Sequence, residues 1–545
     1  MKYKKFISAI IILLLVSINA FSSVKVSIID IKINDKSIIP KYSSNLKKYY
    51  LKNCDKKIYK LDFILSNKKI IKKIVILKEN EGRSVTALNK KYEIFCLKSE
   101  FSKFDYDFIN YKEEKGYVVI DKDRATIIYD NKGNIIWFRE YNNYLPYFSS
   151  IDKNGVLTSI LFNITLKENK HALLSNNIAG SHIIKFDLKD NSIKKTITPF
   201  EFINGVKKFP PIDFHGFYEV NDGYYLISYL DSYINKIPKD YVFDVEDKNM
   251  DKVKELCDNS GKDILIRKPR IIKVDYTGEV IWSYEVDIKP DNNFISLSLY
   301  KNQQEADCVI DVNHPNHIST DESEEIISIG MRNNSILLIK KDKDIIGALG
   351  YNYNNLETDI LEEQKNDNIK NFTYEGDSYG GICSTHSGFI SKKKIIVFDN
   401  RCYSNESSRA VIYNLDYKKL IAKFEKSFLL SDNLNNCYKS NVGKISCNSK
   451  NMGAGRFVDN EYILINWGEV DNSRAVLSIF NNKYQKILEI LGPKIDNQNK
   501  PLYISNYYNE KSFSPFIKSL ESISMGKSAD ILRDEELITK IKKSI

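Results

Sequence analysis

Histidine is scarce in this chain, and most of it lies at the beginnings of predicted β-hairpins. The sequence holds six histidines among 545 residues. Four of them lie in three similar segments, IDFHGFYEV, DVNHPNHIS and CSTHSGFI, which contain His215, His314, His317 and His386. An imidazole with an ordinary pKa of about 6.5 is largely neutral at working pH and can act as a nucleophile, a base or an acid. These residues are therefore the first candidates for chemistry.

The segment that contains His314 also supplies groups that bind anions. Asn316 offers an amide donor, and Arg332 follows the second strand of the same predicted hairpin with a planar guanidinium. No Asp-x-Asp pair or glutamate cluster accompanies them, so a site for a hard cation is not expected. Histidines combined with an arginine and a carboxamide suit a tetrahedral oxyanion. A nucleophilic histidine beside such groups indicates phosphoryl or sulfuryl transfer through a covalent intermediate.

Spaced hairpins repeat along the chain and predict an all-β fold. Segments 127–140 and 271–285 each contain a strand, a D-x-x-G turn and a second strand that carries Trp. Apolar hairpins of a second type lie between such repeats. An inner hairpin followed by an outer hairpin makes a four-stranded blade, so the repetition predicts a six-bladed β-propeller over residues 113–490. The predicted blades begin near residues 117, 155, 212, 311, 384 and 455.

A propeller would bring these distant histidines together, because the innermost strand of each blade lines a central channel. The three histidine segments begin equivalent strands of different blades, so their four histidines would gather at one mouth of the channel. The alternative for each one is structural, since a polar residue at a strand start can satisfy a turn. His171 and His182 lack this register and are expected to be structural or surface residues.

Three further regions flank the predicted propeller. Residues 1–22 have a basic start, a short apolar run and small residues at its end, which is the pattern of a cleaved secretory signal. Residues 23–112 alternate apolar and polar positions and predict a small N-terminal β-sandwich-like domain. Residues 491–545 are predicted as a C-terminal extension that ends in an amphipathic helix. We expect an exported protein, periplasmic or secreted, with no stable membrane anchor after signal cleavage.

Charge and cysteine content exclude several functional classes. The formal net charge is +10, basic and acidic residues are interleaved, and no arginine-rich stripe occurs, so nucleic acid is not an expected partner. The eight cysteines indicate disulfides in an oxidising compartment, and Cys437 and Cys447 bracket a short loop as the predicted local pair. No CxxC motif occurs, and neither a metal nor a cofactor is expected.

The histidine-bearing hairpins resemble those of the bacterial arylsulfate sulfotransferases. In that family His-x-Asn precedes a hairpin whose second strand ends in Arg, as in DVNHPNHISTDESEEIISIGMRNNSILLI. STHSGFISKKKIIVFDN followed by SRAVIYNLD resembles another hairpin of the family, and DFHGFYEVNDGYYLISY resembles an earlier one. The resemblance covers roughly residues 117–490. It implies an exported six-bladed propeller that moves a sulfuryl group from a phenolic sulfate ester to a phenol, without a nucleotide sulfate donor.

The resemblance also implies roles for individual residues. His386 would be the nucleophile that becomes sulfohistidine, and His215 would be a further donor or an acid/base group. The residues that would hold the sulfate oxygens are His314, Asn316 and Arg332. The chain departs from the family at Phe214, where members often carry a histidine, and at Pro315, which separates His314 from Asn316.

The expected partners are a phenolic sulfate donor and a phenol acceptor, and the chain is compatible with a homodimer and with a thiol-oxidase system that forms its disulfides. Two other functions fit parts of the sequence. One is an exported, non-enzymatic β-propeller that binds an anionic or sulfated ligand. The other is a sulfatase or phosphatase, but the chain has neither a carboxylate cluster for a metal nor a Cys/Ser-x-Pro-x-Arg motif.

Overall fold

The computed structural model divides the chain into two compact units, whose described residues lie within Met1–Lys103 and within Phe104–Ile523. The described residues are 27–33, 36–37, 48–52, 58–76, 82–97, 107–112, 116–122, 124–131, 133, 135–141, 144–163, 181–188, 192–237, 254–255, 257–259, 261, 263–285, 297–301, 308–312, 314–331, 335–350, 369–382, 385–400, 408–429, 438–439, 445–446, 449–451, 453–458, 461–470, 476–491 and 505–509. The predicted signal and the final predicted helix lie outside them.

Six sheets, each with a run of four antiparallel strands, dominate the described part of the larger unit. The first consists of β41 (Ser505–Asn509), β9 (Gly116–Lys122), β10 (Ala125–Asp130) and β11 (Ile135–Glu140). The second consists of β12 (Tyr144–Ile151), β13 (Val156–Asn163), β14 (Ser181–Asp187) and β15 (Ser192–Ile197). The third consists of β18 (Ile212–Val220), β19 (Gly223–Ile234), β20 (Ile264–Asp275) and β21 (Val280–Glu285), with β22 (Leu297–Lys301) and β23 (Cys308–Val312) added beside β20.

The other three sheets follow the same order from an inner to an outer strand. The fourth consists of β24 (Pro315–Thr320), β25 (Ile326–Met331), β26 (Ser335–Lys340) and β27 (Ile345–Gly350). The fifth consists of β29 (Thr385–Ser391), β30 (Lys394–Asp399), β31 (Arg409–Asp416) and β32 (Ile421–Leu429), with β28 (Thr373–Glu375) at its edge. The sixth consists of β36 (Ala454–Val458), β37 (Tyr462–Asn466), β39 (Val476–Asn481) and β40 (Lys486–Leu491), with β8 (Asp107–Asn110) at its edge.

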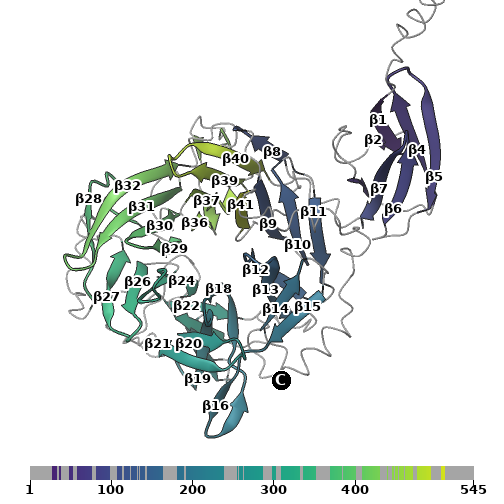
Figure 1. Cartoon of the computed structure of the whole chain (residues 1–545). Coiled ribbons are helices and arrows are strands. Elements are labelled where there is room, and N and C mark those ends of the chain that lie inside the picture. Colours follow the sequence, from purple (N-terminus) through teal and green to yellow (C-terminus); the bar gives the residue numbers. More distant parts are fainter. Residues whose placement is uncertain are drawn as a thin grey trace, which may run out of the picture. The chain divides into compact units, whose positions relative to one another are not determined.

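These sheets follow one another around a closed ring (Figure 1). β41 contacts β12, β13 contacts β18, and from there the inner strands β18, β24, β29 and β36 contact one another in order. β36 in turn contacts β41, which closes the circle. Four-stranded sheets arranged radially around an axis are the architecture of β-propellers. The predicted all-β, propeller-like fold is therefore confirmed.

Strands from beyond both limits of the predicted range 113–490 take part in the ring. β8, from the segment assigned to the N-terminal domain, pairs with β40 in the sixth sheet. β41, from the predicted C-terminal extension, pairs with β9 as the inner strand of the first sheet. The first and the last described strands of this unit are thereby hydrogen-bonded into sheets built from the rest of it. The second sheet likewise begins at Tyr144, earlier than the predicted residue 155, which lies in the turn that leads into β13.

The predicted D-x-x-G turns connect strands where the sequence places them. Asp275 ends β20, and its Oδ1 accepts hydrogen bonds from the backbone N–H groups of Thr277, Gly278 and Glu279 at 2.7–3.0 Å. Gly278 has φ of +97°, and a Cβ there would lie 2.5 Å from the carbonyl oxygen of Thr198. Only glycine combines this backbone angle with so close an approach. The turn chemistry therefore sets the hairpin β20–β21.

Three smaller two-stranded sheets also belong to this unit. They are β16 (Glu201–Ile203) with β17 (Val206–Lys208), β33 (Tyr438–Lys439) with β34 (Ile445–Ser446), and β35 (Ser449–Asn451) with β38 (Glu469–Val470). The pair β33–β34 lies within the predicted Cys437–Cys447 loop, whose two cysteines fall outside the described residues. In the part of the chain with assigned structure, no helix is long and apolar enough to cross a membrane.

The smaller unit contains two sheets that share one core. One sheet has β2 (Lys36–Ser37), β1 (Ile28–Ile33), β4 (Ile58–Leu65) and β5 (Ile70–Ile76), and the other has β3 (Lys48–Lys52), β7 (Lys90–Leu97) and β6 (Gly82–Ala87). Ile31 and Phe63 from the first sheet and Tyr92 from the second are each at most 1% exposed and belong to the same buried cluster. Their alternation with exposed residues matches the predicted half-buried strands.

Candidate active site

Three of the predicted site residues lie at irregular points of three neighbouring inner strands. The register between the inner strand and its partner shifts at the position of His215 in β18, of Asn316 in β24 and of His386 in β29. His314 directly precedes β24. An irregularity of this kind re-aims a side chain out of the ordinary alternation of a strand, and such bulges are common beside active sites. The three inner strands therefore present these residues at corresponding places.

A buried carboxylate holds the imidazole of His215. Asp213 Oδ1 lies 2.6 Å from both the backbone nitrogen and Nδ1 of His215. The hydroxyl of Tyr229 donates to the other oxygen, Oδ2, at 2.8 Å. A carboxylate on Nδ1 fixes the orientation of an imidazole and favours Nδ1 as the donor nitrogen. The hydrogen bond to Asp213 therefore fixes the direction in which Nε2 of His215 points.

His314 has a matching carboxylate partner. Its Nδ1 lies 2.6 Å from Oδ2 of Asp311 in β23. His314 also has φ of +29°, although it is not glycine and is followed by Pro315. A backbone angle of this kind costs free energy and persists only where the surroundings hold it. The ring of His314 meets the ring of His215 edge to face, with centroids 4.9 Å apart, so the two His–Asp pairs adjoin.

An amide oxygen holds His386 instead of a carboxylate. Asn400 Oδ1 lies 2.7 Å from Nδ1 of His386, and both side chains are buried, with exposed fractions of 6% and 8%. An amide oxygen can only accept a hydrogen bond, so Nδ1 must carry the proton. The neutral imidazole then carries its lone pair on Nε2. This is the tautomer that a nucleophilic histidine requires.

Asn316 connects the sheet that carries His314 to the sheet that carries His386. Its Nδ2 donates to the carbonyl oxygen of Thr385, the residue before His386, at 2.8 Å. The hydroxyl of Thr385 in turn donates to the carbonyl oxygen of Met331 at 3.3 Å. The amide nitrogen carries two hydrogens, so this bond accounts for one of them. Arg332, the residue that follows Met331 in the sequence, lies outside the described residues.

A buried charge network underlies the two His–Asp pairs. Burial alone would raise the pKa of Asp213, but the charges and hydrogen bonds of His215 and the charge of His314 outweigh it and lower this pKa to about 2. Arg267 is 5% exposed, and its guanidinium carbon lies 4.9 Å from the ring centroid of Tyr229. Arg267 is also the register partner of Asp311 across β20 and β23. The ion-pair partner of Arg267 is Asp231, whose Oδ1 lies 3.6 Å from the Nε of the guanidinium.

Sequence reasoning missed Asp213, Asp311 and Asn400 as site residues. The two aspartates lie two and three positions before their histidines, and Asn400 lies fourteen positions after His386, at the end of the same hairpin. Short spacings such as Asp-x-His could have been noticed, although they occur in many turns. The Asn400 contact depends on two strands being paired in the correct register, so only the hairpin geometry reveals it.

The fourth histidine of the hairpin segments has a different environment. His317 lies farther along β24 and is 1% exposed, and its ring centroid lies 4.1 Å from that of Phe389. Burial, and secondarily the charge of Arg456, lower its pKa to about 3. His317 is thus a neutral residue of the packing between the fourth and fifth sheets. His182 is also buried, at 3.0 Å from the hydroxyl of Thr198, in line with its expected structural role, and His171 lies outside the described residues.

Replacing His317 by glutamine should flatten the acid dependence of stability. The pKa of His317 is about 3 in the folded chain and about 6.5 when unfolded, so below pH 6.5 the unfolded chain binds a proton that the folded chain does not. The free energy of unfolding therefore falls as the pH falls from about 6.5 toward 3. Without His317, the decrease between pH 6.5 and 4.5 should be smaller by roughly 2–3 kcal/mol.

Urea unfolding at several pH values measures this slope. Ser319→Ala is the matched control, because it removes a buried hydroxyl from the same strand and adds or removes no titrating group. Equal slopes for His317→Gln and for the unchanged protein would show that His317 is not held neutral by burial.

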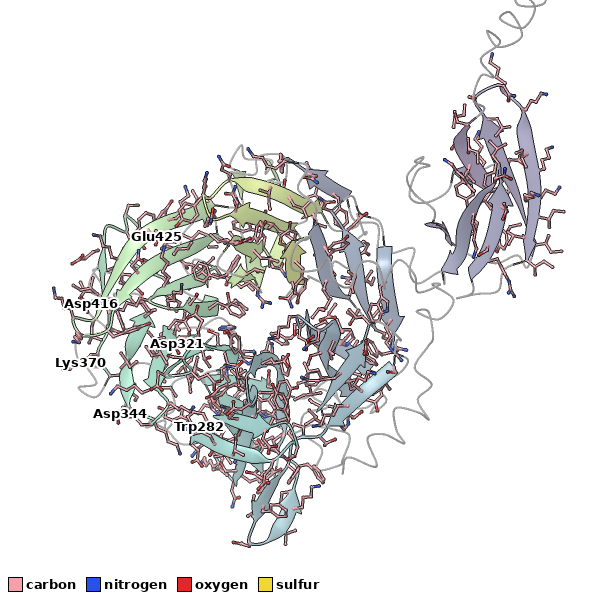
Figure 2. All side chains as sticks on the ribbon, viewed as in Figure 1. Trp282, Asp321, Asp344, Lys370, Asp416 and Glu425 are labelled. Atoms are coloured by element: carbon pink, nitrogen blue, oxygen red, sulfur yellow. A yellow bond between two sulfur atoms is a disulfide. The ribbon has the colours of Figure 1, made fainter. Side chains whose placement is uncertain are left out.

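The opposite end of β24 carries acidic groups. Asp321 follows β24, and its Oδ1 accepts a hydrogen bond from the backbone of Ile326 at 3.1 Å. Glu322 accepts hydrogen bonds from Ser391 and from the backbone of Lys392, at 2.7 and 2.8 Å. Figure 2 labels Asp321 nearer the centre of the ring than Asp344 and Asp416. Acidic side chains therefore gather in the turn at the end of β24 that lies opposite to His314.

A disulfide lies in the same chain segment as Asp311. Cys257 and Cys308 are bonded, and they are separated by 51 positions in the sequence. Cys308 begins β23, which contains Asp311 and pairs in parallel with β20. The disulfide thus ties the strand that carries the partner of His314 to the insertion after β19. In the described part of the chain, no group of three or more His, Cys, Asp or Glu residues could hold a metal ion.

Replacing both Cys257 and Cys308 by serine should lower the free energy of unfolding by about 2–4 kcal/mol, because the unfolded chain would gain the freedom of a long open loop. Denaturant unfolding of the oxidised protein and of the double variant measures the difference. The midpoint should shift to lower denaturant while the cooperative transition remains. An unchanged midpoint would contradict a stabilising role for this disulfide.

Comparison with known proteins identifies no family for this chain. No family model matches it, and no curated protein matches it. Solved structures with a distant likeness include the β-propeller domain of Cps50 (Swd1) from Myceliophteria thermophila, with 11% identity, coverage of 70% of this chain and 88% of that chain, and a TM-score of 0.30. Another is apo AztD from Citrobacter koseri, with 8% identity, coverage of 73% and 99%, and a TM-score of 0.31. These likenesses concern the fold and not the chemistry.

Proposed function

We propose that this chain is an exported aryl-sulfate sulfotransferase that carries the sulfuryl group on His386. One observation supports this proposal above the others. Three histidines lie in or directly before neighbouring inner strands, and a different oxygen partner holds Nδ1 of each. Two of these partners are carboxylates and one is a neutral amide, which distinguishes two carboxylate-held histidines, proposed as donors, from one amide-held histidine, proposed as the nucleophile.

The proposal also assigns the architecture in finer detail. The six sheets would be the six blades of a propeller, and the smaller unit would be a separate N-terminal β-sandwich-like domain. The chain would act in the periplasm or outside the cell, where the Cys257–Cys308 disulfide can form. The reaction needs no cofactor, because the donor ester already contains the activated sulfuryl group.

In the first half-reaction, Nε2 of His386 attacks the sulfur of an aryl sulfate. The N–S bond forms as the bond between sulfur and the aryl oxygen breaks, and the phenolate leaves with the electron pair of that bond. His215 or His314, each paired with an aspartate, supplies the proton that neutralises the phenolate. The peripheral oxygens of the sulfuryl group are stabilised by His314, Asn316 and Arg332, the last of which is assigned from the sequence alone.

In the second half-reaction, an acceptor phenol attacks the sulfur of the sulfohistidine. Its proton passes to the histidine that gave one up in the first step, and the N–S bond breaks to restore His386. The two steps share one site, so donor and acceptor bind in turn and the kinetics are ping-pong. The neutral amide partner, Asn400, suits both steps because it holds the ring without stabilising a permanent imidazolium.

The direct test uses purified protein with 4-nitrophenyl sulfate, in the presence and absence of a second phenol. Acceptor-dependent release of 4-nitrophenol, with the acceptor recovered as its sulfate ester, is the expected result. Release that proceeds to completion without an acceptor would indicate a sulfatase instead. Binding of the aryl sulfate with no release under any acceptor would favour the alternative, an exported propeller that binds an anionic or sulfated ligand.

A further inference from the structure

A short β-hairpin, β16–β17, reaches outward from the ring of sheets (Figure 1). Its two strands pair antiparallel in the register Glu201–Lys208, Phe202–Lys207 and Ile203–Val206. Two residues, Asn204 and Gly205, make the turn, with φ of +52° and +75°. Asn-Gly with positive φ at both positions is the combination that favours a tight type I′ hairpin. The Asn-Gly turn therefore favours formation of the projecting hairpin by its own local sequence.

The base of the hairpin is attached firmly to the third sheet. Both carboxylate oxygens of Glu201 accept hydrogen bonds from the guanidinium of Arg270 in β20, each at 2.9 Å. The preceding residue, Phe200, exchanges backbone hydrogen bonds with Gly278 and Val280, at 2.7 and 2.8 Å. A bidentate pair with a buried arginine fixes geometry as well as charge. The hairpin thus projects on a rigid support.

The tip of the hairpin is apolar on both of its faces. Phe202, Ile203 and Val206 are exposed by 58%, 48% and 55%. Residues directly opposite each other in an antiparallel pair share a face, so Ile203 and Val206 lie on one face and Phe202 lies on the other. Single exposed apolar residues are ordinary, but three on one projecting turn are not. A partner that docks on one face of the hairpin would leave the other face exposed to water.

Cationic groups lie directly behind this apolar tip. Lys208 is exposed, and Lys207 is half-buried with its Nζ 4.1 Å from the ring centroid of Phe200. The carboxylate of Glu201 is neutralised by Arg270, so the net charge of the hairpin is positive. The hairpin therefore has apolar side chains at its tip and lysines nearer its base. This order is complementary to a lipid bilayer, which is apolar inside and anionic at its surface.

We propose that β16–β17 is a membrane-contact hairpin that inserts Phe202, Ile203 and Val206 into the interface of an anionic bilayer. Lys207 and Lys208 would lie at the level of the lipid phosphates. A bilayer surrounds an inserted tip and covers both faces, as the distribution of apolar residues requires. Three side chains give a reversible, peripheral attachment and not a spanning anchor. The inference is independent of the proposed transferase activity.

The test is sedimentation of the purified full chain with lipid vesicles. Vesicles of equal parts phosphatidylglycerol and phosphatidylcholine should bind the protein at low salt, and vesicles of phosphatidylcholine alone should bind it less. A tip variant with Phe202→Thr, Ile203→Thr and Val206→Thr retains β-forming residues and the Asn-Gly turn. Its vesicle partition coefficient should be lower by at least about tenfold.

The matched control replaces two exposed isoleucines elsewhere on the same unit, Ile281→Thr and Ile345→Thr, which are 51% and 41% exposed. This control should bind vesicles as the unchanged protein does. Replacing Lys207 and Lys208 by glutamine should weaken binding to anionic vesicles and reduce its dependence on salt.

Two results would overturn the proposal. One is a lack of vesicle binding by the unchanged protein at low salt. The other is equal binding by the tip variant and the control, which would place the lipid contact elsewhere. Loss of a dimer in the tip variant without any vesicle binding would assign the hairpin to a protein partner instead. Each measurement is made without a sulfate donor, so its outcome is separate from that of the activity test.

Discussion

His386→Ala should lower the rate of sulfuryl transfer by at least about 10³-fold, because the variant lacks the nitrogen that forms the covalent intermediate. In the proposed mechanism no other residue can replace it. Asn400 holds Nδ1 of His386 as the donor, which places the lone pair on Nε2, whereas carboxylates hold Nδ1 of His215 and His314. Acceptor-dependent release of 4-nitrophenol measures the loss directly.

Trapping of the intermediate gives a second readout. Unchanged protein incubated with donor and no acceptor should gain the mass of one SO₃ group on the peptide that contains His386, and the alanine variant should not. The matched control is His182→Gln. His182 is also a buried histidine, but it lies in the second sheet, away from His386 in the fifth, and contacts Thr198. It should retain activity within about twofold of the unchanged protein. Transfer that survives in His386→Ala would exclude this residue as the carrier.

The propeller-like fold could be predicted because each hairpin carries its own local signal. Such a unit is defined by a strand, a turn with residues such as Asp275 and Gly278, and a second strand. Repetition of the unit implies a ring. The strands that close the ring carry no such signal. β8 and β41 each pair with a strand distant in the sequence, so their place depends on the completed ring and not on local pattern.

The candidate site could be predicted only in part, for a related reason. The spacing of His215, His314 and His386 before strands follows from the hairpin repeat, and the contacts bear out that His215 and His314 meet. His317 occurs in the same motif but packs against Phe389, because position along a strand decides whether a side chain reaches the site or the core. The bulges that re-aim the site residues, such as the one at Asn316, leave no trace in the hydrophobic pattern.

The oxygen partners of the histidines show what sequence patterns miss. Asp311 reaches His314 from β23, an added strand that pairs in parallel with β20. Its presence depends on an insertion that interrupts the repeat, and an insertion is unpredictable from the repeat itself. Partners of this kind are found from geometry.

Asp213→Asn and Asp311→Asn should each lower kcat by roughly 10- to 100-fold, the usual effect of removing the carboxylate that orients a functional histidine. An asparagine side chain can turn its NH₂ group toward Nδ1, which would favour the tautomer with the proton on Nε2 and remove the nearby negative charge. The imidazole would then be oriented less well as a donor to the sulfuryl oxygens and the leaving phenolate. Because these interactions strengthen in the transition state, kcat should fall more than KM rises.

The leaving group distinguishes this role from a structural one. An aryl sulfate with a poor leaving phenol needs the proton more than 4-nitrophenyl sulfate does, so the loss in the two variants should be larger for unsubstituted phenyl sulfate. Asp231→Asn is the matched control, since Asp231 lies in the same sheet and faces Arg267, at 3.6 Å, instead of a histidine. Its kcat should stay within about twofold for both donors. Equal losses for the two donors in Asp213→Asn and Asp311→Asn would mean that the carboxylates support the fold and leave proton transfer to other groups.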